Sequence, residues 1–382
     1  MTDIFKPNYQ EVLGFTYLPP RLPHREKQIE MILETFKPFL EGYRTAFNPP
    51  LLYGKTGTGK TSSMKLAANM IRKKMKKDVV LHYAHINCTI HGKSYLAAQK
   101  IAEKVSSIPV RGYGESELLS RVYEELETRD EYLLLVLDDL DDLIRRDRGR
   151  LLYIVTRLEE MGEFPEKRIL PVLIMRSEKM LMLTQPAVRS KITGFRIPFP
   201  PYTKEEMMSI VKQRVDLALN PRRITKNAML QISYNSAVLG EVDARQAINL
   251  LKMSGETARK LGREKILVEH VRMAQQSYGT GVLPGMEREV DRIGLTILMA
   301  IARIFKDDYD KFSASMTEIY REFSELSKKM DTSPIPSKEV KAKIAELSDL
   351  GIISIVDKRV VLPSISADEL YQRIASTLFK ET

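Results

Sequence analysis

The sequence has few of the features that mark secreted and membrane proteins. Its 382 residues include one cysteine, Cys88, which excludes an internal disulfide framework and indicates a reducing interior. No apolar run approaches the roughly 18 residues that suggest a membrane span. The first ten residues, MTDIFKPNYQ, lack the basic-then-apolar pattern of a signal peptide. These absences predict a soluble intracellular protein. Cys88 ends the apolar stretch VVLHYAHINC, which favours a packed thiol over a nucleophile.

The charge of the chain permits a polyanionic partner but does not require one. At 382 residues the chain is too long for one ordinary core, so two or three domains are expected. The formal net charge is +10, yet residues 286–382 carry 15 basic and 17 acidic side chains. A DNA-binding surface in that last segment must therefore be a local basic patch on a mixed background.

Short apolar runs alternate with amphipathic helical stretches between about residues 49 and 200, which is typical of a parallel α/β sheet. The prolines of FPPY, residues 199–202, break this pattern, and the chain then reads as helical to about residue 277. A glycine-containing joint follows at 277–285. The predicted strands are 50–53, 79–87, 132–137, 169–175 and 194–197, and the expected domains are 1–201, 202–285 and 286–382.

The last segment has the element order of a winged helix. Helical patterns cover residues 287–306, 317–330 and 337–350, and two short strands follow within 352–363, with Asp357 and Lys358 at their tip. Three helices closed by a β-hairpin form the winged variant of helix-turn-helix. Any helical domain with a hairpin would give the same pattern, so the order alone does not decide the function.

One stretch carries a specific chemical signal. In LLYGKTGTGKTSSMKL, residues 51–66, an apolar strand runs into a glycine-rich loop and then a helix, matching G-x-x-x-x-G-K-[ST]. Glycine lets backbone N–H groups approach phosphate oxygens, and the helix adds its positive N-terminal dipole. Lys60 is placed to reach the β- and γ-phosphates, and the Thr61 hydroxyl to coordinate Mg²⁺. The predicted contacts to ATP or ADP are Gly54, Gly57, Thr58, Gly59, Lys60 and Thr61.

A second stretch, YLLLVLDDLDDL at residues 132–143, supplies acidic partners for the metal. Six apolar residues predict a buried strand, and Asp138 and Asp139 follow at its carboxyl end, where open α/β sheets place ligands. We expect Asp138 to contact Mg²⁺ through water and Asp139 to orient the attacking water. The alternative is an acidic N-cap for the next helix.

These motifs and their order resemble the archaeal origin-recognition initiators of the Orc/Cdc6 type, AAA+ ATPases related to the largest subunit of the eukaryotic origin recognition complex. The resemblance implies an AAA+ α/β nucleotide-binding domain, a helical lid domain and a C-terminal winged-helix domain. It runs nearly end to end, through LPHRE (22–26), YGKTGTGKT (53–61), LVLDDLD (135–141), FPPYTKEEM (199–207), VDARQAINLL (242–251) and ELSDLGII (346–353).

The resemblance also implies further nucleotide contacts. Leu22, Pro23 and Arg25 match the segment that lies near adenine in the family. Tyr202 and Arg214 match the tyrosine and arginine with which the lid completes the pocket. Arg245, in the motif DAR, matches the sensor-2 arginine that contacts the γ-phosphate. Without the resemblance, Arg245 reads as an exposed helix arginine and Tyr202 equally well as a core aromatic.

Three departures from the family surround the γ-phosphate. Asp139 replaces the usual glutamate and is shorter by one methylene, which reduces its reach to a lytic water. Ser177 occupies the sensor-1 position, which is usually asparagine. Ala187 stands where relatives often carry an arginine, with Arg189 two residues away. We therefore expect firm binding of ATP or ADP and, at most, slow hydrolysis.

DNA contacts are expected from two places. Residues 108–126 occupy the position of a DNA-contacting helical insertion in the family, where Arg111 and Tyr113 could approach a phosphate; a surface turn is the alternative. In the winged helix, the third helix would lie in the major groove. We expect Ser337 to cap it. The candidate phosphate contacts are Lys338 and Lys341 on one face, Lys343 elsewhere on the helix, and Lys358 and Arg359 on the wing.

The sequence thus predicts a nucleotide-regulated initiator that binds origin duplex DNA, with ATP or ADP and Mg²⁺ as cofactors and no membrane partner. A related initiator subunit and the replicative helicase are further expected partners, and the location is cytoplasmic, with the nucleoid. Two alternatives stay open: an AAA+ loader or motor resembling a clamp-loader subunit, and an adaptor whose winged helix binds proteins.

Overall fold

The computed structural model describes residues 3–43, 47–105, 112–161, 166–239, 243–277, 290–330 and 335–379. The chain forms two compact units: residues 18–201, and residues 1–17 together with residues 202–382. The sequence analysis places residues 1–17 in the α/β domain, whereas in the structure they cluster with the residues after 201.

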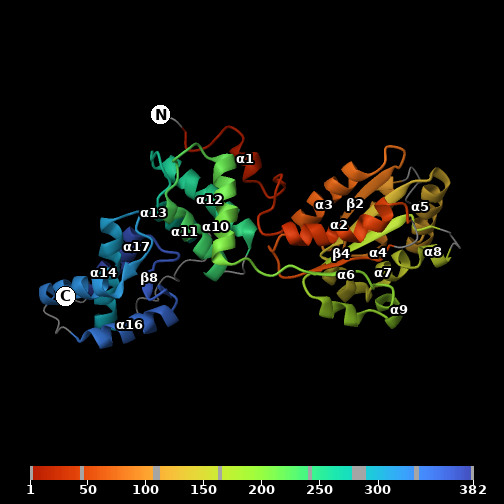
Figure 1. Ribbon diagram of the computed structural model, residues 1–382. Coiled ribbons are helices and arrows are strands. Elements are labelled where there is room, and N and C mark those ends of the chain that lie inside the picture. Colours follow the sequence, from red (N-terminus) through yellow and green to blue (C-terminus); the bar gives the residue numbers. More distant parts are fainter. Residues whose placement is uncertain are drawn as a thin grey trace. The chain divides into compact units, whose positions relative to one another are not determined.

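The unit of residues 18–201 is built on a parallel sheet, of which Figure 1 labels β2 and β4. Its five strands have the order β2-β3-β4-β1-β5. Every pairing between neighbouring strands is parallel. The strands are β1 Leu51–Tyr53, β2 Leu81–Asn87, β3 Tyr132–Asp138, β4 Ile169–Met175 and β5 Arg196–Pro198. This confirms the parallel α/β fold predicted from the apolar runs, and each strand lies within two residues of its predicted range.

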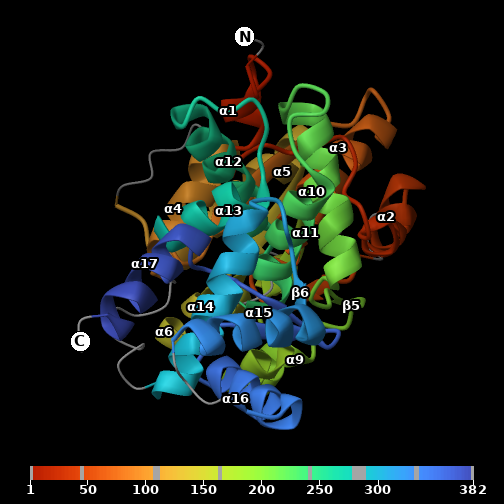
Figure 2. The same ribbon diagram turned by 90° about the vertical axis from the view of Figure 1, so that its left-hand side faces the viewer.

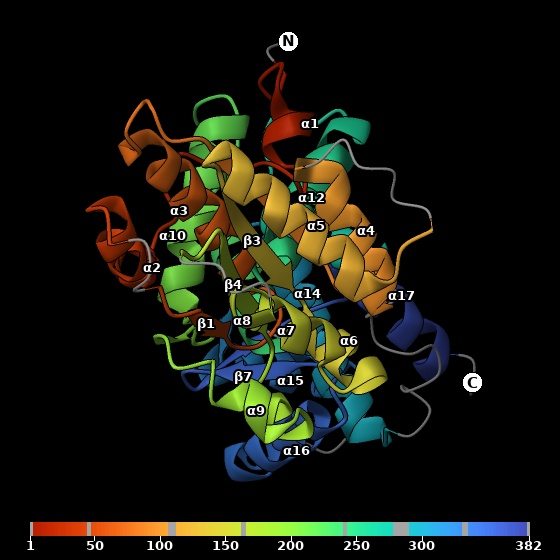
Figure 3. The same cartoon turned by 90° about the vertical axis from the view of Figure 1, so that its right-hand side faces the viewer.

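Helices cover both faces of this sheet because the buried side chains alternate along its strands (Figure 3). In β3, Leu133, Leu135 and Leu137 pack against α4 Ser94–Val105 and α5 Glu115–Arg129. Leu134 and Val136 face the opposite way, toward α2 Glu26–Leu40 and α3 Lys60–Lys74. The remaining elements of this unit are α6 Leu140–Asp147, α7 Arg150–Val155, α8 Leu158–Met161, the 3₁₀ helix η1 Glu178–Leu183 and α9 Pro186–Arg189.

The other unit begins with helices that follow the FPPY break. They are α10 Lys204–Ala218, α11 Lys226–Tyr234, the π-helical turn η2 Asn235–Leu239, α12 Ala244–Lys260 and α13 Val268–Gln275. The N-terminal segment, with α1 Tyr9–Val12, packs on them. The Lys6 N–H donates to the Ala218 carbonyl (2.8 Å), and the Phe5 ring lies so close to Gly255 that a Cβ there would be 2.3 Å from it. This contact explains why residues 1–17 belong with this unit.

The last helices and strands form the predicted winged helix (Figure 2). Strands β6, β8 and β7 pair antiparallel in that order. Asp357 and Lys358 form the tip of the β7–β8 hairpin, and both have a positive φ, 47° and 62°. Two-residue turns with positive φ at both residues match the twist of the flanking strands. The elements are α14 Arg292–Asp307, β6 Ala314–Ser315, α15 Met316–Lys329, α16 Ser337–Asp349, β7 Ser354–Val356, β8 Arg359–Val361 and α17 Ala367–Leu378.

One prediction about α16 is wrong. Ser337 is its first helical residue, and the N-cap position belongs to Pro336, which has no side-chain oxygen to offer. The expected joint at 277–285 lies outside the described residues except for Ser277, as does the start of the helix predicted from 287. In the described part of that helix, Asp291 is the N-cap and accepts a hydrogen bond from the Gly294 N–H (2.7 Å).

A buried polar bridge joins the helices after FPPY to the winged helix. The Arg272 side chain on α13 is fully buried, and its guanidinium donates to Glu269 (3.1 Å) and to the carbonyls of Lys311 (2.8 Å) and Leu362 (3.3 Å). Glu269 in turn accepts from the Ala367 N–H (2.8 Å), at the start of α17. Because these groups have left water, each depends on its partners, and the bridge holds the two parts of this unit together.

Among the residues that the structure describes, no helix is both long enough and apolar enough to cross a membrane.

Candidate nucleotide site and DNA-facing elements

The phosphate-binding loop lies between β1 and α3, and its glycines serve two different purposes. Gly57 and Gly59 have φ of 74° and 89°, the left-handed conformation that residues with a Cβ rarely adopt. Gly54 also has a positive φ (152°), and it has a packing reason in addition, because a Cβ there would lie 2.2 Å from the Phe199 carbonyl oxygen, just after β5. The pattern therefore encodes both the turn of the loop and its seat against the sheet.

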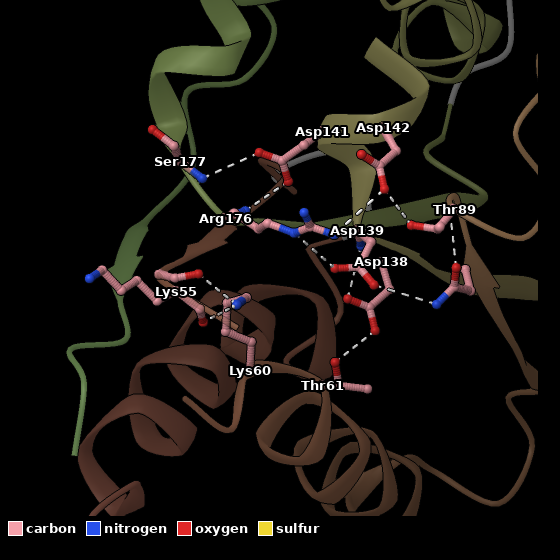
Figure 4. Close-up of polar contacts among 12 residues, drawn as sticks. Lys55, Lys60, Thr61, Thr89, Asp138, Asp139, Asp141, Asp142, Arg176 and Ser177 are labelled. Carbon is pink, nitrogen blue, oxygen red and sulfur yellow. Dashed lines mark hydrogen bonds and ion pairs between the residues drawn. The ribbon is translucent and has the colours of Figure 1, made fainter. Parts of the chain in front are cut away.

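Lys60 is nearly buried at the start of α3, and its ammonium faces the loop. Its Nζ donates to the carbonyls of Gly54 (2.7 Å) and Lys55 (2.8 Å), as Figure 4 shows. The Thr58 hydroxyl also donates to the Lys55 carbonyl (2.9 Å), which fixes the middle of the loop. A cation held at the centre of a loop of left-handed glycines is suited to phosphate oxygens.

Arg25 fastens this loop to the end of the sheet. Its side chain is 1% exposed, and its guanidinium donates to the carbonyls of Thr58 (2.7 Å), His24 (2.8 Å) and Pro200 (2.7 Å). These bonds give Arg25 a structural task in shaping the phosphate loop. Leu22 and Pro23, just before it, are half-buried, and the placement of all three near adenine stays a prediction.

Asp138, the last residue of β3, lies against the start of α3. Its Oδ2 accepts hydrogen bonds from the Thr61 hydroxyl (2.7 Å) and from His85 Nε2 (2.9 Å), and its Oδ1 accepts from the Asp139 N–H (3.0 Å). Burial acts to raise the pKa of Asp138, but the hydrogen bonds from His85 and Thr61 outweigh it, so the pKa lies below its ordinary value. The carboxylate is therefore ionised and fixed beside Thr61 (Figure 4).

Asp139 faces a cation that the sequence analysis did not consider. Arg176, directly after β4, points its guanidinium at Asp139 (4.0 Å) and Asp142 (3.6 Å). The Asn87 amide approaches Asp139 from β2 (3.5 Å). Asp139 occupies the N-cap position of α6, but its carboxylate makes no capping hydrogen bond, so the structure gives no support to the capping alternative.

The backbone N–H and the hydroxyl of Ser177 both form local hydrogen bonds. Asp141 accepts from the N–H groups of Arg176 (2.7 Å) and Ser177 (3.3 Å), which fixes the chain at the end of β4. The Ser177 hydroxyl accepts from the Lys179 N–H (3.3 Å) and so caps the 3₁₀ helix that follows. In Figure 4 this hydroxyl is directed away from Thr61.

Arg189 does not replace the arginine that relatives often carry at the position of Ala187. Both residues lie on α9, and the Arg189 guanidinium donates to the carbonyls of Thr184 and Met182 at the end of η1. It is thus occupied in closing the turn before α9.

The remaining nucleotide candidates belong to the other compact unit. Tyr202 is 5% exposed and packs in the core around α10. Arg214 is nearly buried, donates to the Val12 carbonyl (3.2 Å) and lies over the Tyr17 ring, while its Nε has no hydrogen-bond partner among the described residues. Burial lowers the pKa of Arg214. Arg245 is exposed in the first turn of α12, beside the Asp243 cap.

The Thr61–Asp138 pair fits the Mg²⁺ ion that such a loop requires. A hydroxyl and a carboxylate are oxygen ligands, and Mg²⁺ takes few protein ligands because it keeps several waters and binds substrate phosphates. Accordingly, the described residues include no group of three or more His, Cys, Asp or Glu side chains that could hold a metal by themselves.

Some of the predicted DNA-contacting cations of the winged helix are exposed to solvent, and others form ion pairs or hydrogen bonds within the protein. Lys338 and Lys341 are exposed on α16, and Lys358 is exposed at the hairpin tip. Lys343 instead pairs with Asp291 (2.8 Å) and Glu346 (2.8 Å). Arg359 is exposed but tied to the Ser313 hydroxyl (2.8 Å) and, more distantly, to Glu318 (3.7 Å). Three of the five predicted cations are thus exposed without a described ion pair.

The predicted DNA contact near α5 falls partly outside the described residues, since Arg111 lies in the segment 106–111. Tyr113 is half-buried against the core of its unit, with the Arg121 guanidinium over its ring (4.2 Å). This packing suits the surface-turn alternative as well as a DNA contact.

Comparison with known proteins decides the family. The model of the Cdc6 AAA+ ATPase-type lid domain matches residues 208–276, an AAA domain model matches residues 48–178, and the CDC6 C-terminal winged helix model matches residues 288–360. The ORC1-type DNA replication protein 1 of Archaeoglobus fulgidus is 30% identical over 351 residues, covering 91% of this chain and 83% of the relative. The ORC1-type protein of Pyrococcus abyssi is 28% identical, over 90% of this chain and 82% of its own length.

The chain belongs to the ORC1-type DNA replication proteins.

Solved structures agree with the fold of this ORC1-type protein. Cdc6p from Pyrobaculum aerophilum is similar over 99% of both chains, with a TM-score of 0.88 and 23% identity. The ORC1 protein of Aeropyrum pernix in complex with DNA has a TM-score of 0.65 and 27% identity, over 100% of this chain and 99% of its own. The predicted AAA+ sheet, helical lid and winged helix are confirmed, and the AAA domain makes the protein a nucleotide-binding one.

Sequence reasoning missed three residues of this ORC1-type site. Tyr83 and His85 lie two residues apart within β2, and Arg176 directly follows β4, at positions that none of the motifs marks. An alternating polar pair within VVLHYAHINC is the one signal that could have drawn attention to the first two. For Arg176 the signal is a charged residue directly after the buried run ILPVLIM.

Proposed function

We propose that this protein is an ATP- or ADP-binding initiator that contacts origin duplex DNA and whose bound nucleotide sets its DNA-binding state. The observation that carries the nucleotide half is the hydrogen bond between Thr61 and Asp138, which brings the two predicted Mg²⁺ contacts together at the phosphate loop. We propose that Thr61 and Asp138 hold Mg²⁺, directly and through water, while Lys60 contacts the β- and γ-phosphates.

The DNA half rests on the winged helix. The ORC1 protein of Aeropyrum pernix, 27% identical to this chain, was solved in complex with DNA. The exposed Lys338, Lys341 and Lys358 are proposed to contact phosphates, which positions the protein on a duplex but carries no sequence information by itself. Tyr113 and Arg111 are proposed as a second contact. We also propose that the domain boundaries lie at 201/202 and 285/286. We propose a related initiator subunit or the replicative helicase as a protein partner.

Slow hydrolysis is part of the proposal, because the groups that should act on the γ-phosphate are occupied. Asp139 is opposed by the Arg176 guanidinium, and the Ser177 hydroxyl caps η1. A motor or loader needs turnover, so this arrangement favours a switch. We propose that Tyr202, Arg214 and Arg245 complete the nucleotide contacts from the lid.

The experiment that tests the nucleotide site is nucleotide analysis of the purified protein. We expect wild-type protein to carry ADP and the Lys60→Ala variant to lose it, because the cation that faces the phosphates is removed. Lys55→Ala is the matched control, since its backbone carbonyl, but not its side chain, contacts Lys60. Nucleotide-free wild-type protein with only millimolar affinity for ADP would contradict the proposal.

A further inference from the structure

Asp138 receives more hydrogen bonds than its motif requires. Thr61 is the expected donor, but His85 Nε2 reaches the same oxygen from β2 (2.9 Å), and the Tyr83 hydroxyl lies 3.0 Å from His85 Nδ1. In the register of β2 with β3, Asn87 lies opposite Asp138 and His85 lies opposite Val136. His85 is thus a diagonal neighbour of Asp138, within reach across two parallel strands.

The protonation of this chain of contacts follows from what each group can donate. An ionised carboxylate only accepts, so the Asp138 oxygen requires the proton of His85 to sit on Nε2. When the imidazole is neutral, its Nδ1 accepts from the Tyr83 hydroxyl, and when both nitrogens carry a proton, Nδ1 donates to the Tyr83 oxygen, so Tyr83 contacts the ring in either state. Tyr83 therefore fixes the ring of His85, and His85 fixes the carboxylate.

The arrangement also fixes Thr61. Its single hydroxyl proton is directed at Asp138, which leaves the oxygen lone pairs turned away from the carboxylate. With His85 and the Asp139 N–H as its other two donors, the carboxylate has little freedom to rotate. Side chains that orient a metal ligand from behind in this way commonly change metal affinity when they are removed.

We infer that His85, oriented by Tyr83, is a positioning residue that holds Asp138 and Thr61 in the geometry for binding the Mg²⁺ of a magnesium–nucleotide complex. The inference rests on the proposed nucleotide site and deepens it. His85 touches neither nucleotide nor metal in this account; it acts through Asp138.

The test is isothermal titration of nucleotide-free full-length protein with ADP, once with Mg²⁺ and once with EDTA. The ratio of the two affinities measures what Mg²⁺ contributes. We expect His85→Ala to reduce that ratio about tenfold or more, while the affinity in EDTA changes less than about twofold, since Lys60 and the loop are untouched. His85→Gln, which keeps an N–H donor, should restore most of the ratio, and Tyr83→Phe should give a smaller loss.

His82→Ala is the matched control. His82 lies on the same strand and also hydrogen-bonds a carboxylate, Glu131 (2.7 Å), away from the phosphate loop. It should leave the Mg²⁺ ratio unchanged. If His85→Ala keeps the wild-type ratio, or lowers both affinities by the same factor, the inference is overturned and the proposed nucleotide site stands. A wild type whose ADP affinity ignores Mg²⁺ would overturn the proposed Mg²⁺ site as well.

Discussion

At the scale of single residues, the Arg176 guanidinium beside Asp139 determines how fast we expect ATP to be hydrolysed. A carboxylate orients a lytic water when it can reach that water and when its charge is not satisfied elsewhere. Asp139 is short by one methylene, and Arg176 opposes it (4.0 Å). The same guanidinium faces Asp142 (3.6 Å), so Arg176 has a second carboxylate to hold it when Asp139 changes.

Lengthening the side chain at position 139 and removing the Arg176 guanidinium should together raise the rate of ATP hydrolysis. We expect Asp139→Glu alone to increase single-turnover ATP hydrolysis modestly, and Asp139→Glu with Arg176→Gln to increase it by about tenfold or more, because the carboxylate is then longer and the Arg176 guanidinium no longer faces it. Radiolabelled phosphate release from pre-bound ATP is the measurement. Arg145→Gln is the matched control, since Arg145 pairs with the same Asp142 (3.9 Å) from within α6. Fast wild-type turnover that Asp139→Glu lowers would instead favour a motor.

The sequence indicated that the phosphate loop and Asp138 lie near each other, because each follows a buried strand of one parallel sheet, and the carboxyl ends of such strands share an edge. The sequence analysis did not predict the hydrogen bonds of Ser177, Arg189 and Arg359. The Ser177 hydroxyl caps the 3₁₀ helix that begins after it, whereas Arg189 and Arg359 bind groups outside the motifs that contain them. Nor could the sequence analysis predict His85, whose partner lies on a neighbouring strand 53 residues away in the chain.

At the scale of elements, strands with an apolar pattern of their own were predictable, and the short strand β6 and helix α17 were not. β3 reads as an unbroken apolar run, and every residue of it is buried. β6 has only two residues and exists through its pairing with β8, so no local pattern marks it. Helix α17 follows the wing and packs against α14, where the sequence analysis had no motif to place it.

The winged-helix domain should contact DNA through Lys358 on the wing and not through Lys343 on α16. We expect Lys358→Ala to lower the slope of log affinity against log salt by about 0.9, equally on specific and unrelated duplexes, because one phosphate contact is lost. Titration of labelled duplex at several salt concentrations measures this. Lys343→Ala is the control, since Lys343 is already paired with Asp291 and Glu346. The idea fails if Lys358→Ala leaves the slope unchanged while residues 1–285 alone bind as tightly.

The capping box at the start of α15 should make the winged helix acid-sensitive. Hydrogen bonds from Lys311 and from Ser315 lower the pKa of Glu318 to about 2, from 4.5. Because the folded-state pKa is the lower one, this contribution to stability is complete above about pH 5 and disappears as the pH falls toward 2. We therefore expect the difference in denaturation midpoint between wild type and Glu318→Gln to be constant near neutrality and to shrink below pH 4. A difference that grows on acidification would contradict this account.

At the scale of the whole molecule, the buried bridge around Arg272 should bind the lid and winged helix into one cooperative unit. Removing one partner of a buried ion pair leaves the other uncompensated and costs about 3–5 kcal/mol. We expect Arg272→Met to destabilise residues 202–382 by about this much, and Arg272→Met with Glu269→Gln to be less destabilising than the single change. Urea denaturation followed by circular dichroism gives both values. Arg373→Met, which removes a partly exposed pair with Glu369, is the control and should cost far less.

The central claim is that bound nucleotide sets the DNA-binding state, and coupling of this kind is reciprocal between the two sites. The most direct test is titration of labelled duplex with one preparation of full-length protein in three states: nucleotide-free, with Mg²⁺ and ADP, and with Mg²⁺ and a non-hydrolysable ATP analogue. The account predicts DNA affinities that differ about fivefold or more between the ADP and ATP states, and a Lys60→Ala variant whose affinity ignores nucleotide. Identical DNA affinity in all three states, with nucleotide shown to be bound, would contradict it.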